Sequence, residues 1–209
     1  MGAADKRLPS RVLMVLLGSA VMGLSIDLLV LAGFGLDPLS LFQAGLSSVF
    51  GITLGRASQI LMISIMAVLL VIDRKRIGIG SVLNSVLVGY FVNLFSNWLP
   101  MAGPQSLWVR CVGVAAGFLL MGFGIGTYIS AHLGEAGVDA LMVYFAEKLK
   151  LRIRGTRIAL DVLLAAAGFF MGGSLGWATL ASMVLNGYVI QLTVGMWSGI
   201  IGRQTTVSL

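Results

Sequence analysis

The chain has 209 residues, of which 58% are hydrophobic and 11% charged, with a formal net charge of +6 and a mean hydropathy of +0.99. This is more apolar surface than a soluble domain of that length can enclose, so the composition excludes a soluble globular protein and predicts an integral membrane protein. The apolar stretches are long and do not alternate, which excludes β-barrel strands. The basic residues flank these stretches, as membrane topology requires, and do not indicate a nucleic-acid partner.

Hydropathy predicts six membrane-spanning helices, because roughly 17–25 apolar residues are needed to cross a hydrocarbon core of about 30 Å. The first is expected to be an uncleaved span and not a signal peptide. The expected fold is all-α, a single polytopic membrane domain over residues 1–209. The predicted spans are about 12–34, 57–72, 78–99, 107–129, 158–172 and 175–200.

The distribution of basic residues predicts the orientation of these spans. Six spans with both termini in the cytoplasm place every basic cluster on the inside, while the loop 97–106 is uncharged and outside. We therefore expect a multi-pass protein of the bacterial inner membrane with cytoplasmic N- and C-termini. Arg56 and Arg110 are exceptions near the outer surface. The clusters are Lys6, Arg7 and Arg11, then 74–76, then 148–157, and finally Arg203.

Two halves of the chain carry similar features in the same order, at an offset of about 99–102 residues. Repeat 1 covers about 11–98 and repeat 2 about 107–200. Each half holds three spans, an odd number, so the second half is expected to be inserted upside down, as in secondary transporters. The matched features are Arg11 with Arg110, Met22-Gly23 with Met121-Gly122, Asp37 with Asp139, Gly55-Arg56 with Gly155-Thr156-Arg157, and Asn84 with Asn186.

A short helix preceded by Asp is predicted between the first and second spans of each half. In the first half, Asp37 is a candidate N-cap and Pro38 the first helical residue. These helices either lie in the membrane interface or enter the membrane as re-entrant segments. The second spans, 57–72 and 158–172, are short, which either marks a transporter binding site or means that extended ends complete them. The predicted apolar faces are Leu39, Phe42, Leu46 and Val49, opposite Ser40, Gln43 and Ser47, and in the second half Val138, Leu141, Met142, Phe145 and Leu149.

These segments resemble the YczE/YitT group of bacterial multi-pass membrane proteins over nearly the whole chain. The resemblance rests on GFGLDPLSLFQAGLS, GITLGRAS and GIGSVLNSVLVGYFVNLF in the first half, and on GEAGVDALM and the segment from RGTRIALDVLL to LNGYVIQL in the second. Family members usually have Pro and a final Gly in the turn at 134–140, where this chain has Gly137 and Ala140. They often carry Glu where Asp161 stands. The resemblance implies membrane topology and transport without naming a substrate.

Asp27 lies well inside the first span, without a charged neighbour in sequence. A carboxylate at that depth is costly unless it is protonated, paired or facing water, which makes it a candidate for proton or cation coupling. The alternative is a neutral Asp that hydrogen-bonds a neighbouring helix. Arg56, from the same half, is the predicted charge partner.

Asp161 follows Arg157 by four residues, which places both on one helix face. This is either a simple helical ion pair or part of a substrate site, in which Arg157 contacts an anionic group and the turn carrying Glu135 and Asp139 contributes charge. These carboxylates lack the fixed geometry of a metal site, and no metal is expected.

Three amides, Gln43, Asn84 and Asn186, lie in apolar segments. Each either joins helices or lines a pathway, because a buried amide in lipid needs a partner. Glycines recur at small-xxx-small spacing, chiefly as packing surfaces, and one such surface is a candidate homodimer face.

The sequence favours a secondary transporter that moves a small solute by alternating access between two inverted repeats. It contains no nucleotide-binding loop, nucleophile elbow or His-rich cluster, so no enzymatic activity and no cofactor is expected. Membrane lipids and an unidentified solute or ion are the expected partners. The alternatives are a non-transporting accessory or scaffold protein and a lipid-handling protein with a laterally open groove.

Overall fold

The computed structural model describes residues 7–99 and 106–201. These residues form eight α-helices, and a 3₁₀ helix at Arg74–Arg76 joins α3 to α4. The protein is therefore all-helical, as predicted. The helices are α1 (Leu8–Ala32), α2 (Pro38–Phe50), α3 (Leu54–Ile72), α4 (Ile79–Ser96), α5 (Leu107–Ser130), α6 (Gly137–Lys148), α7 (Ile153–Phe170) and α8 (Trp177–Ile201).

Five helices in the described part of the chain are long and apolar enough to cross a membrane: α1, α3, α4, α5 and α8. The helix α7 has 18 residues, about 27 Å at 1.5 Å per residue, but it carries Arg154, Arg157 and Asp161. Both α3 and α7 begin ahead of the predicted starts at 57 and 158. The two segments predicted to be unusually short are thus completed by additional helical residues at their N-terminal ends.

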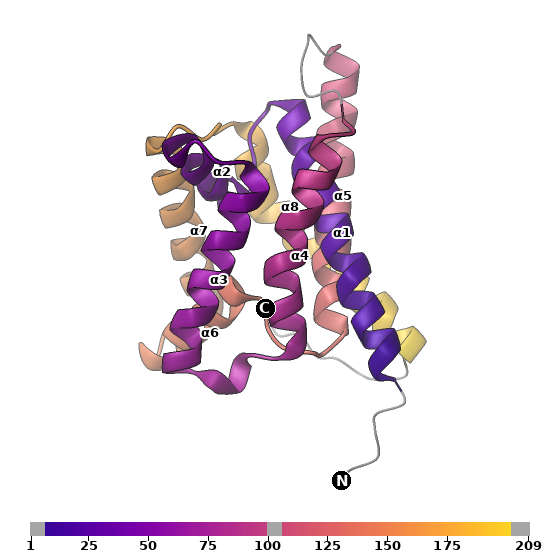
Figure 1. Ribbon diagram of the computed structural model, residues 1–209, viewed down its shortest axis with the longest axis vertical. Helices are drawn as coiled ribbons and strands as arrows, with labels where there is room; N and C mark the ends of the chain where they lie inside the picture. Colours follow the sequence, from indigo (N-terminus) through magenta and orange to yellow (C-terminus); the bar gives the residue numbers. More distant parts are fainter. Residues whose placement is uncertain (1–6, 100–105, 202–209) are drawn as a thin grey trace.

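The eight helices form two groups, as Figure 1 shows. One group is the bundle of α1, α4, α5 and α8. In this bundle α1 packs along α5, α4 packs against α1, and α8 packs against α5. The other group is α2, α3, α6 and α7, in which each short helix contacts both α3 and α7. Contact between α3 and α4 joins the groups, whereas α7 meets α8 only weakly.

The long helices α1 and α5 are antiparallel, and an arginine at the start of each caps the end of the other. Arg11 Nε donates to the carbonyl oxygen of Ala131 (2.6 Å), and its Nη2 donates to that of His132. Arg110 Nε donates to the carbonyl oxygen of Ala32 (2.7 Å), and its Nη2 donates to that of Gly33 (3.2 Å). Since the last carbonyls of a helix lack intrahelical partners, both arginines satisfy them and complement the helix dipole. This capping role explains why Arg110 lies near the expected outer surface, where the distribution of basic residues did not predict an arginine.

The offset of 99 residues between Arg11 and Arg110 recurs in the backbone conformation. Positive φ angles occur at Gly33, Gly35 and Gly51, and again 99 positions later at His132, Gly134 and Lys150. The starts of α4 and α8 also match: Gly80 N donates to the Leu133 carbonyl oxygen (2.8 Å), and Ala178 N to that of Phe34 (3.1 Å). Gly80 and Ala178 are 98 positions apart in the chain.

These matches correct two of the pairs read from the sequence. An offset of 99 places Asp37, the N-cap of α2, opposite Ala136, the N-cap of α6, while Asp139 lies inside the first turn of α6. An offset of 98 places Asn84 opposite Ser182, one helical turn before Asn186.

Most of the small-residue patterns serve helix contacts within the chain. A Cβ at Gly117 would meet Leu29 of α1, whereas one at Gly122 or Gly126 would meet α8. Close backbone approach at small residues is the usual means of helix association in lipid. These glycines are therefore not available for a second copy.

Candidate functional site

The short helix α2 presents its polar side to the protein. Ser40 and Gln43 are buried, whereas Val49 and Phe50 are exposed. The sequence alone does not decide which side of this helix faces the protein, because in a membrane the outer surroundings are also apolar. Gln43 Oε1 is buried without a hydrogen-bond partner among the described residues. The inner face of α2 thus carries two polar side chains beside the fully buried Leu41.

Arg157 lies between two carboxylates on α6 and α7. Its Nη1 is 3.2 Å from Oδ1 of Asp139, and its Nε is 3.9 Å from Oδ2 of Asp161. The helical pair of Arg157 with Asp161 was predicted, and Asp139 joins it from the neighbouring helix. All three side chains are partly exposed.

Asp37 extends this charged group toward the other end of α7. It interacts electrostatically with Asp161. Its Oδ2 accepts a hydrogen bond from Ser40 N (3.2 Å), while its Oδ1 is buried without a partner in the described structure. We call Asp37, Asp139, Arg157 and Asp161 the α7 charge line.

A second charged group surrounds Arg76, between the α3–α4 connection and α6. Arg76 contacts Oδ2 of Asp73 (2.9 Å), Oε1 of Glu135 (3.3 Å) and Oε2 of Glu147. Its backbone carbonyl oxygen also accepts a hydrogen bond from Glu135 N (3.1 Å). From the sequence, Arg76 was interpreted only as part of a basic cluster that sets topology, and its ion pairs were not predicted. The i,i+3 spacing of Asp73 and Arg76 could have indicated one of these pairs.

Burial raises the pKa of Glu135 above its ordinary value, and the neighbouring Arg76 lowers it only in part. Oε2 of Glu135 has no partner among the described residues. Asp139 and Glu147 both interact with it electrostatically, so Glu135 also links the Arg76 group to the α7 charge line. Together the two groups contain six of the eight acidic residues of the chain: Asp37, Asp73, Glu135, Asp139, Glu147 and Asp161.

Asp27 is almost completely buried in α1, and its Oδ2 has no hydrogen-bond partner in the described part of the chain. It lies one helical turn after Gly23, whose backbone lies against Phe91 and Val92 of α4. Arg56, its predicted partner, is exposed and forms no ion pair with any described residue. The predicted pairing of Asp27 with Arg56 is therefore wrong, and Asp27 is a separate buried carboxyl.

The two span amides behave differently. Asn84 Oδ1 accepts a hydrogen bond from Ser19 Oγ (3.0 Å), which joins α4 to α1. Asn186 Oδ1 is buried without a partner in the described structure. Asn84 thus has the helix-joining role, and Asn186 stays a candidate pathway residue.

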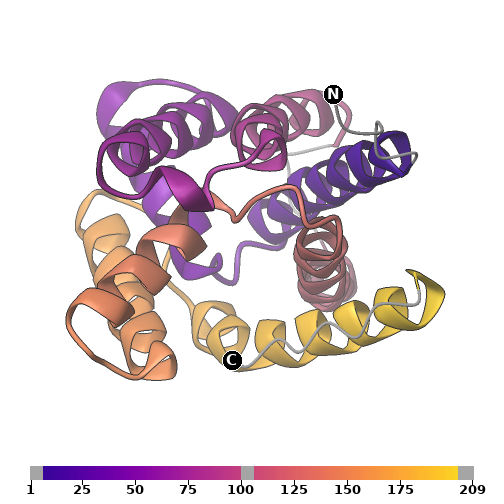
Figure 2. The same ribbon diagram turned by 90° about the horizontal axis from the view of Figure 1, so that it is seen from below.

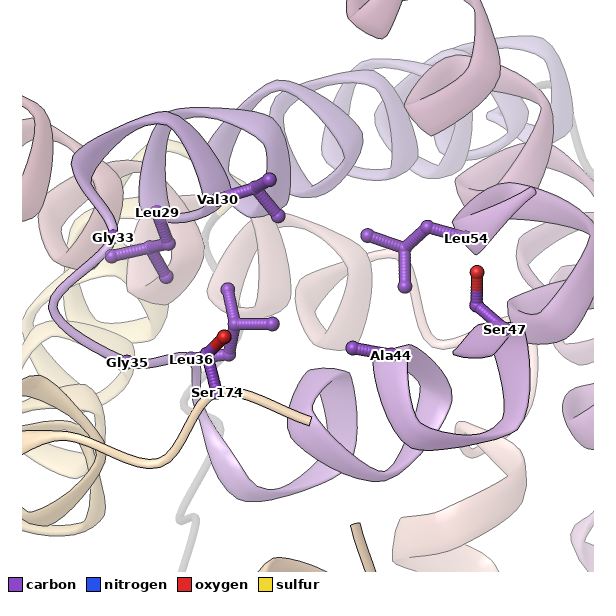
Figure 3. Close-up of a pocket in the computed structure, with 9 residues that line it drawn as sticks. All are labelled: Leu29, Val30, Gly33, Gly35, Leu36, Ala44, Ser47, Leu54 and Ser174. Atoms are coloured by element: carbon purple, nitrogen blue, oxygen red, sulfur yellow. The ribbon is translucent and has the colours of Figure 1, made fainter. Parts of the chain in front are cut away.

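A pocket of about 240 Å³ opens where α1 ends and α2 and α3 begin. Figure 3 shows its mainly apolar walls and the hydroxyl groups of Ser47 and Ser174. No residue predicted as a site residue lines this pocket. Its lining residues are Leu29, Val30, Gly33, Gly35, Leu36, Ala44, Ser47, Leu54 and Ser174.

No set of three or more His, Cys, Asp or Glu residues in the described ranges is arranged to hold a metal ion. The largest acidic groups contain an arginine that already neutralises part of their charge. What the arrangement offers is hydrogen-bond acceptors and carboxylates around two guanidinium groups.

Comparison with known proteins places the chain among membrane proteins. It is 29% identical over 177 residues to an uncharacterized protein of Haemophilus influenzae, which covers 85% of this chain and 80% of that protein. It is also 29% identical over 160 residues to the uncharacterized membrane protein YczE of Bacillus subtilis, with 77% and 74% coverage. The uncharacterized protein YyaS of Bacillus subtilis is 21% identical over 180 residues, with 84% and 88% coverage. No solved structure matches the chain.

The resemblance to YczE read from the sequence is therefore confirmed, and the protein is an integral membrane protein. Residues 9–194 match a protein family described as a family of unknown function, DUF6198. The chain belongs to the DUF6198 family.

Proposed function

We propose that this protein is a secondary transporter of a small solute, in which two inverted halves exchange conformations to give alternating access. In this proposal α1–α4 form one half and α5–α8 the other, with α7 as the sixth span. Inverted repeats are typical of secondary transporters, where the substrate site lies between the repeats.

The observation that carries the proposal is the reciprocal capping of α1 and α5. Arg11 and Arg110 are 99 positions apart, and so are the residues whose carbonyl oxygens they bind, Ala32 with Ala131 and Gly33 with His132. The same contact at opposite ends of two antiparallel helices is what a two-fold axis in the membrane plane would produce, so it supports the proposed inverted relation. The matched positive φ angles and the matched starts of α4 and α8 support the same relation.

The α7 charge line is the proposed substrate or ion site. Arg157 provides a guanidinium group, and Asp139 and Asp161 provide carboxylates on two helices, so acidic groups outnumber the cation at this site. Asp27 is the proposed coupling group in the bundle, since a buried carboxyl with an unpartnered oxygen, Oδ2, can gain or lose a proton as access changes. In this proposal the ion pair of Glu135 with Arg76 bounds the α7 charge line at its α6 end.

Transport can be measured with purified protein in liposomes. A thermal-shift screen of metabolites identifies ligands, since a compound that binds only the folded state raises its stability. Uptake of each hit is then followed under an imposed proton or sodium gradient. We expect Asp27→Asn and Asp161→Asn to abolish gradient-driven uptake, while Ser64→Ala, a lipid-facing polar residue of α3, leaves it unchanged. Full uptake by both Asn variants would remove the assigned roles, and the absence of any gradient-dependent flux would remove the transporter proposal.

Lipid handling is a second candidate, favoured by the weak contact between α7 and α8. A lateral opening beside charged residues suits an amphiphile whose head group enters the protein while its tail stays in lipid. The same liposomes, loaded with a fluorescent phospholipid, distinguish the two functions. Accelerated movement of that phospholipid between leaflets, without solute uptake, would favour lipid handling.

A further inference from the structure

The contact between α3 and α4 depends on two glycines. A Cβ at Gly55 would collide with the carbonyl oxygen of Gly89, and a Cβ at Gly89 would collide with that of Gly55 and with Cγ of Gln59. Gln59 Nε2 also donates to the carbonyl oxygen of Val86 (2.9 Å). The two helices are therefore in close backbone contact, fixed by one amide hydrogen bond.

The corresponding helices of the second half are apart. Gly187 on α8 lies 98 positions after Gly89. A Cβ added at Gly187 would have no atom of another helix within 4 Å. Ile158 on α7, 99 positions after Gln59, is 56% exposed. Viewed from below in Figure 2, α6 and α7 lie to one side while α8 runs away from them.

A glycine inside a helix weakens that helix relative to alanine unless close packing uses the space. At Gly89 the packing of α3 uses it, whereas at Gly187 nothing in this conformer does. Gly89 and Gly187 thus correspond in position, but only Gly89 is packed against another helix.

We propose that this structure is one of two conformers that the halves exchange. In the second conformer α7 lies against α8, with Ile158 on Gly187 as Gln59 now lies on Gly89, and α3 leaves α4. The proposal rests on the inverted repeat in the proposed function and names the helices that move. Because Arg157 and Asp161 are on α7, this movement would change which side of the membrane can reach the α7 charge line.

The chemistry of the two contacts differs in two respects. At the offset of 99 that places Ile158 opposite Gln59, Gly55 falls on Arg154, so the contact of α7 with α8 has one glycine where that of α3 with α4 has two. Ile158 has no amide, so the contact of α7 with α8 lacks a counterpart of the hydrogen bond from Gln59 to Val86. A contact held by apolar packing alone competes poorly with lipid, which is itself apolar. This explains why the α3–α4 contact is the one formed here.

Disulfide cross-linking in native membranes tests the exchange, in a Cys111→Ser background that removes the free cysteine. We expect Ile158→Cys with Gly187→Cys to form a disulfide within one chain. The matched control is Ile158→Cys with Leu185→Cys, at a similar depth on another face of α8, which is expected to stay reduced.

Three results would overturn the proposal: no disulfide between positions 158 and 187, equal cross-linking of the Leu185 control, or cross-linking of Gly187→Cys alone between two chains. The last would assign this face to a homodimer. The assay needs no substrate, so it can fail independently of the transport measurement.

A second variant addresses the same movement without cysteines. Gly187→Leu leaves the present conformer unobstructed, since the surrounding space is open, but it blocks the approach of α7. We expect unchanged thermal stability and at least a tenfold loss of uptake of any solute identified in the screen. Unchanged uptake with a stable Gly187→Leu protein would overturn the proposal.

Discussion

At the scale of single residues, Arg157 has both an observed structural contact and a proposed role in binding the substrate. It bridges α6 and α7 through Asp139 and Asp161, but all three side chains are partly exposed. Ion pairs of this exposure contribute little to stability, commonly about 0.2–1 kcal/mol by double-mutant cycles. Stability alone therefore does not explain this arrangement on α6 and α7, which is the basis of the proposed recognition of a charged ligand.

A double-mutant cycle on Arg157→Gln and Asp139→Asn separates these two roles. We expect a coupling free energy of unfolding below about 1 kcal/mol, because solvent screens the pair. The stabilisation of the protein by its ligand is expected to disappear in both single variants. A coupling of several kcal/mol, with ligand stabilisation intact, would identify the pair as purely structural.

Glu135 gives a prediction for the effect of pH. Burial raises its pKa above the ordinary 4.5, so the folded protein holds this proton at a higher pH than the unfolded chain does. Its stabilising contribution is thus present in acid and is lost as the pH rises through the raised pKa. The groups acting on it are Arg76 from the α3–α4 connection and Asp139 and Glu147 from α6.

Replacing Glu135 by Gln removes this titration. We expect the melting temperature of Glu135→Gln, relative to wild type, to increase as the pH is raised from about 4 toward 7, across and above the ordinary glutamate range. Thermal unfolding in detergent at several pH values measures this difference. A difference that does not change with pH, or one that decreases, would mean that Arg76 fully compensates for the burial of the carboxylate.

At the scale of elements, the contact between α2 and α7 depends on Gly168. A Cβ there would lie 2.6 Å from the carbonyl oxygen of Leu41 and 2.7 Å from Phe42 N, both backbone atoms of α2 that cannot move independently. We expect Gly168→Ala to lower the free energy of unfolding by about 1–3 kcal/mol, the usual cost of overpacking. It should also displace the polar face of α2 from the α7 charge line.

Gly155→Ala is the control, because it makes the same change in the same helix where nothing lies within 4 Å of the added Cβ. Alanine favours helix over glycine by up to about 1 kcal/mol, so this variant should be as stable as wild type or slightly more stable. Thermal unfolding of both proteins in one detergent gives the comparison. Equal stability of the two variants would show that α2 can adjust its position at little cost.

The order of the eight helices could be predicted from the sequence, because hydrophobic length and the Asp37-Pro38 start are local signals. Which side of α2 faces inward could not, since in lipid an apolar side can face either the protein or the membrane. The Arg76 group, the contact of Arg157 with Asp139 and the approach of Gly45 to Gly168 are equally invisible, because each joins segments far apart in the chain.

At the scale of the whole molecule, charge is distributed unevenly. The chain is strongly basic overall, with a net charge of +6, yet six of its eight acidic residues lie along the α7 charge line and around Arg76. A helix with charges facing lipid would not be stable in a membrane, so α7 can span only if α2, α3 and α6 cover its charged side. Helix α7 contacts α2 and α6, although Arg157, Asp139 and Asp161 stay partly exposed.

Whether α7 crosses the membrane decides the topology of the protein. If it does, Lys150 and Ser174, on either side of this helix, lie on opposite sides of the membrane, and the chain has six spans with both termini in the cytoplasm. In a Cys111→Ser background, we expect an impermeant maleimide to label Lys150→Cys only in inside-out vesicles and Ser174→Cys only in intact spheroplasts. Lys75→Cys and Ser106→Cys, in the connections after α3 and before α5, serve as the inside and outside references. Labelling of positions 150 and 174 from the same side would leave five spans, place the termini on opposite sides, and remove the inverted relation between the two halves on which alternating access depends.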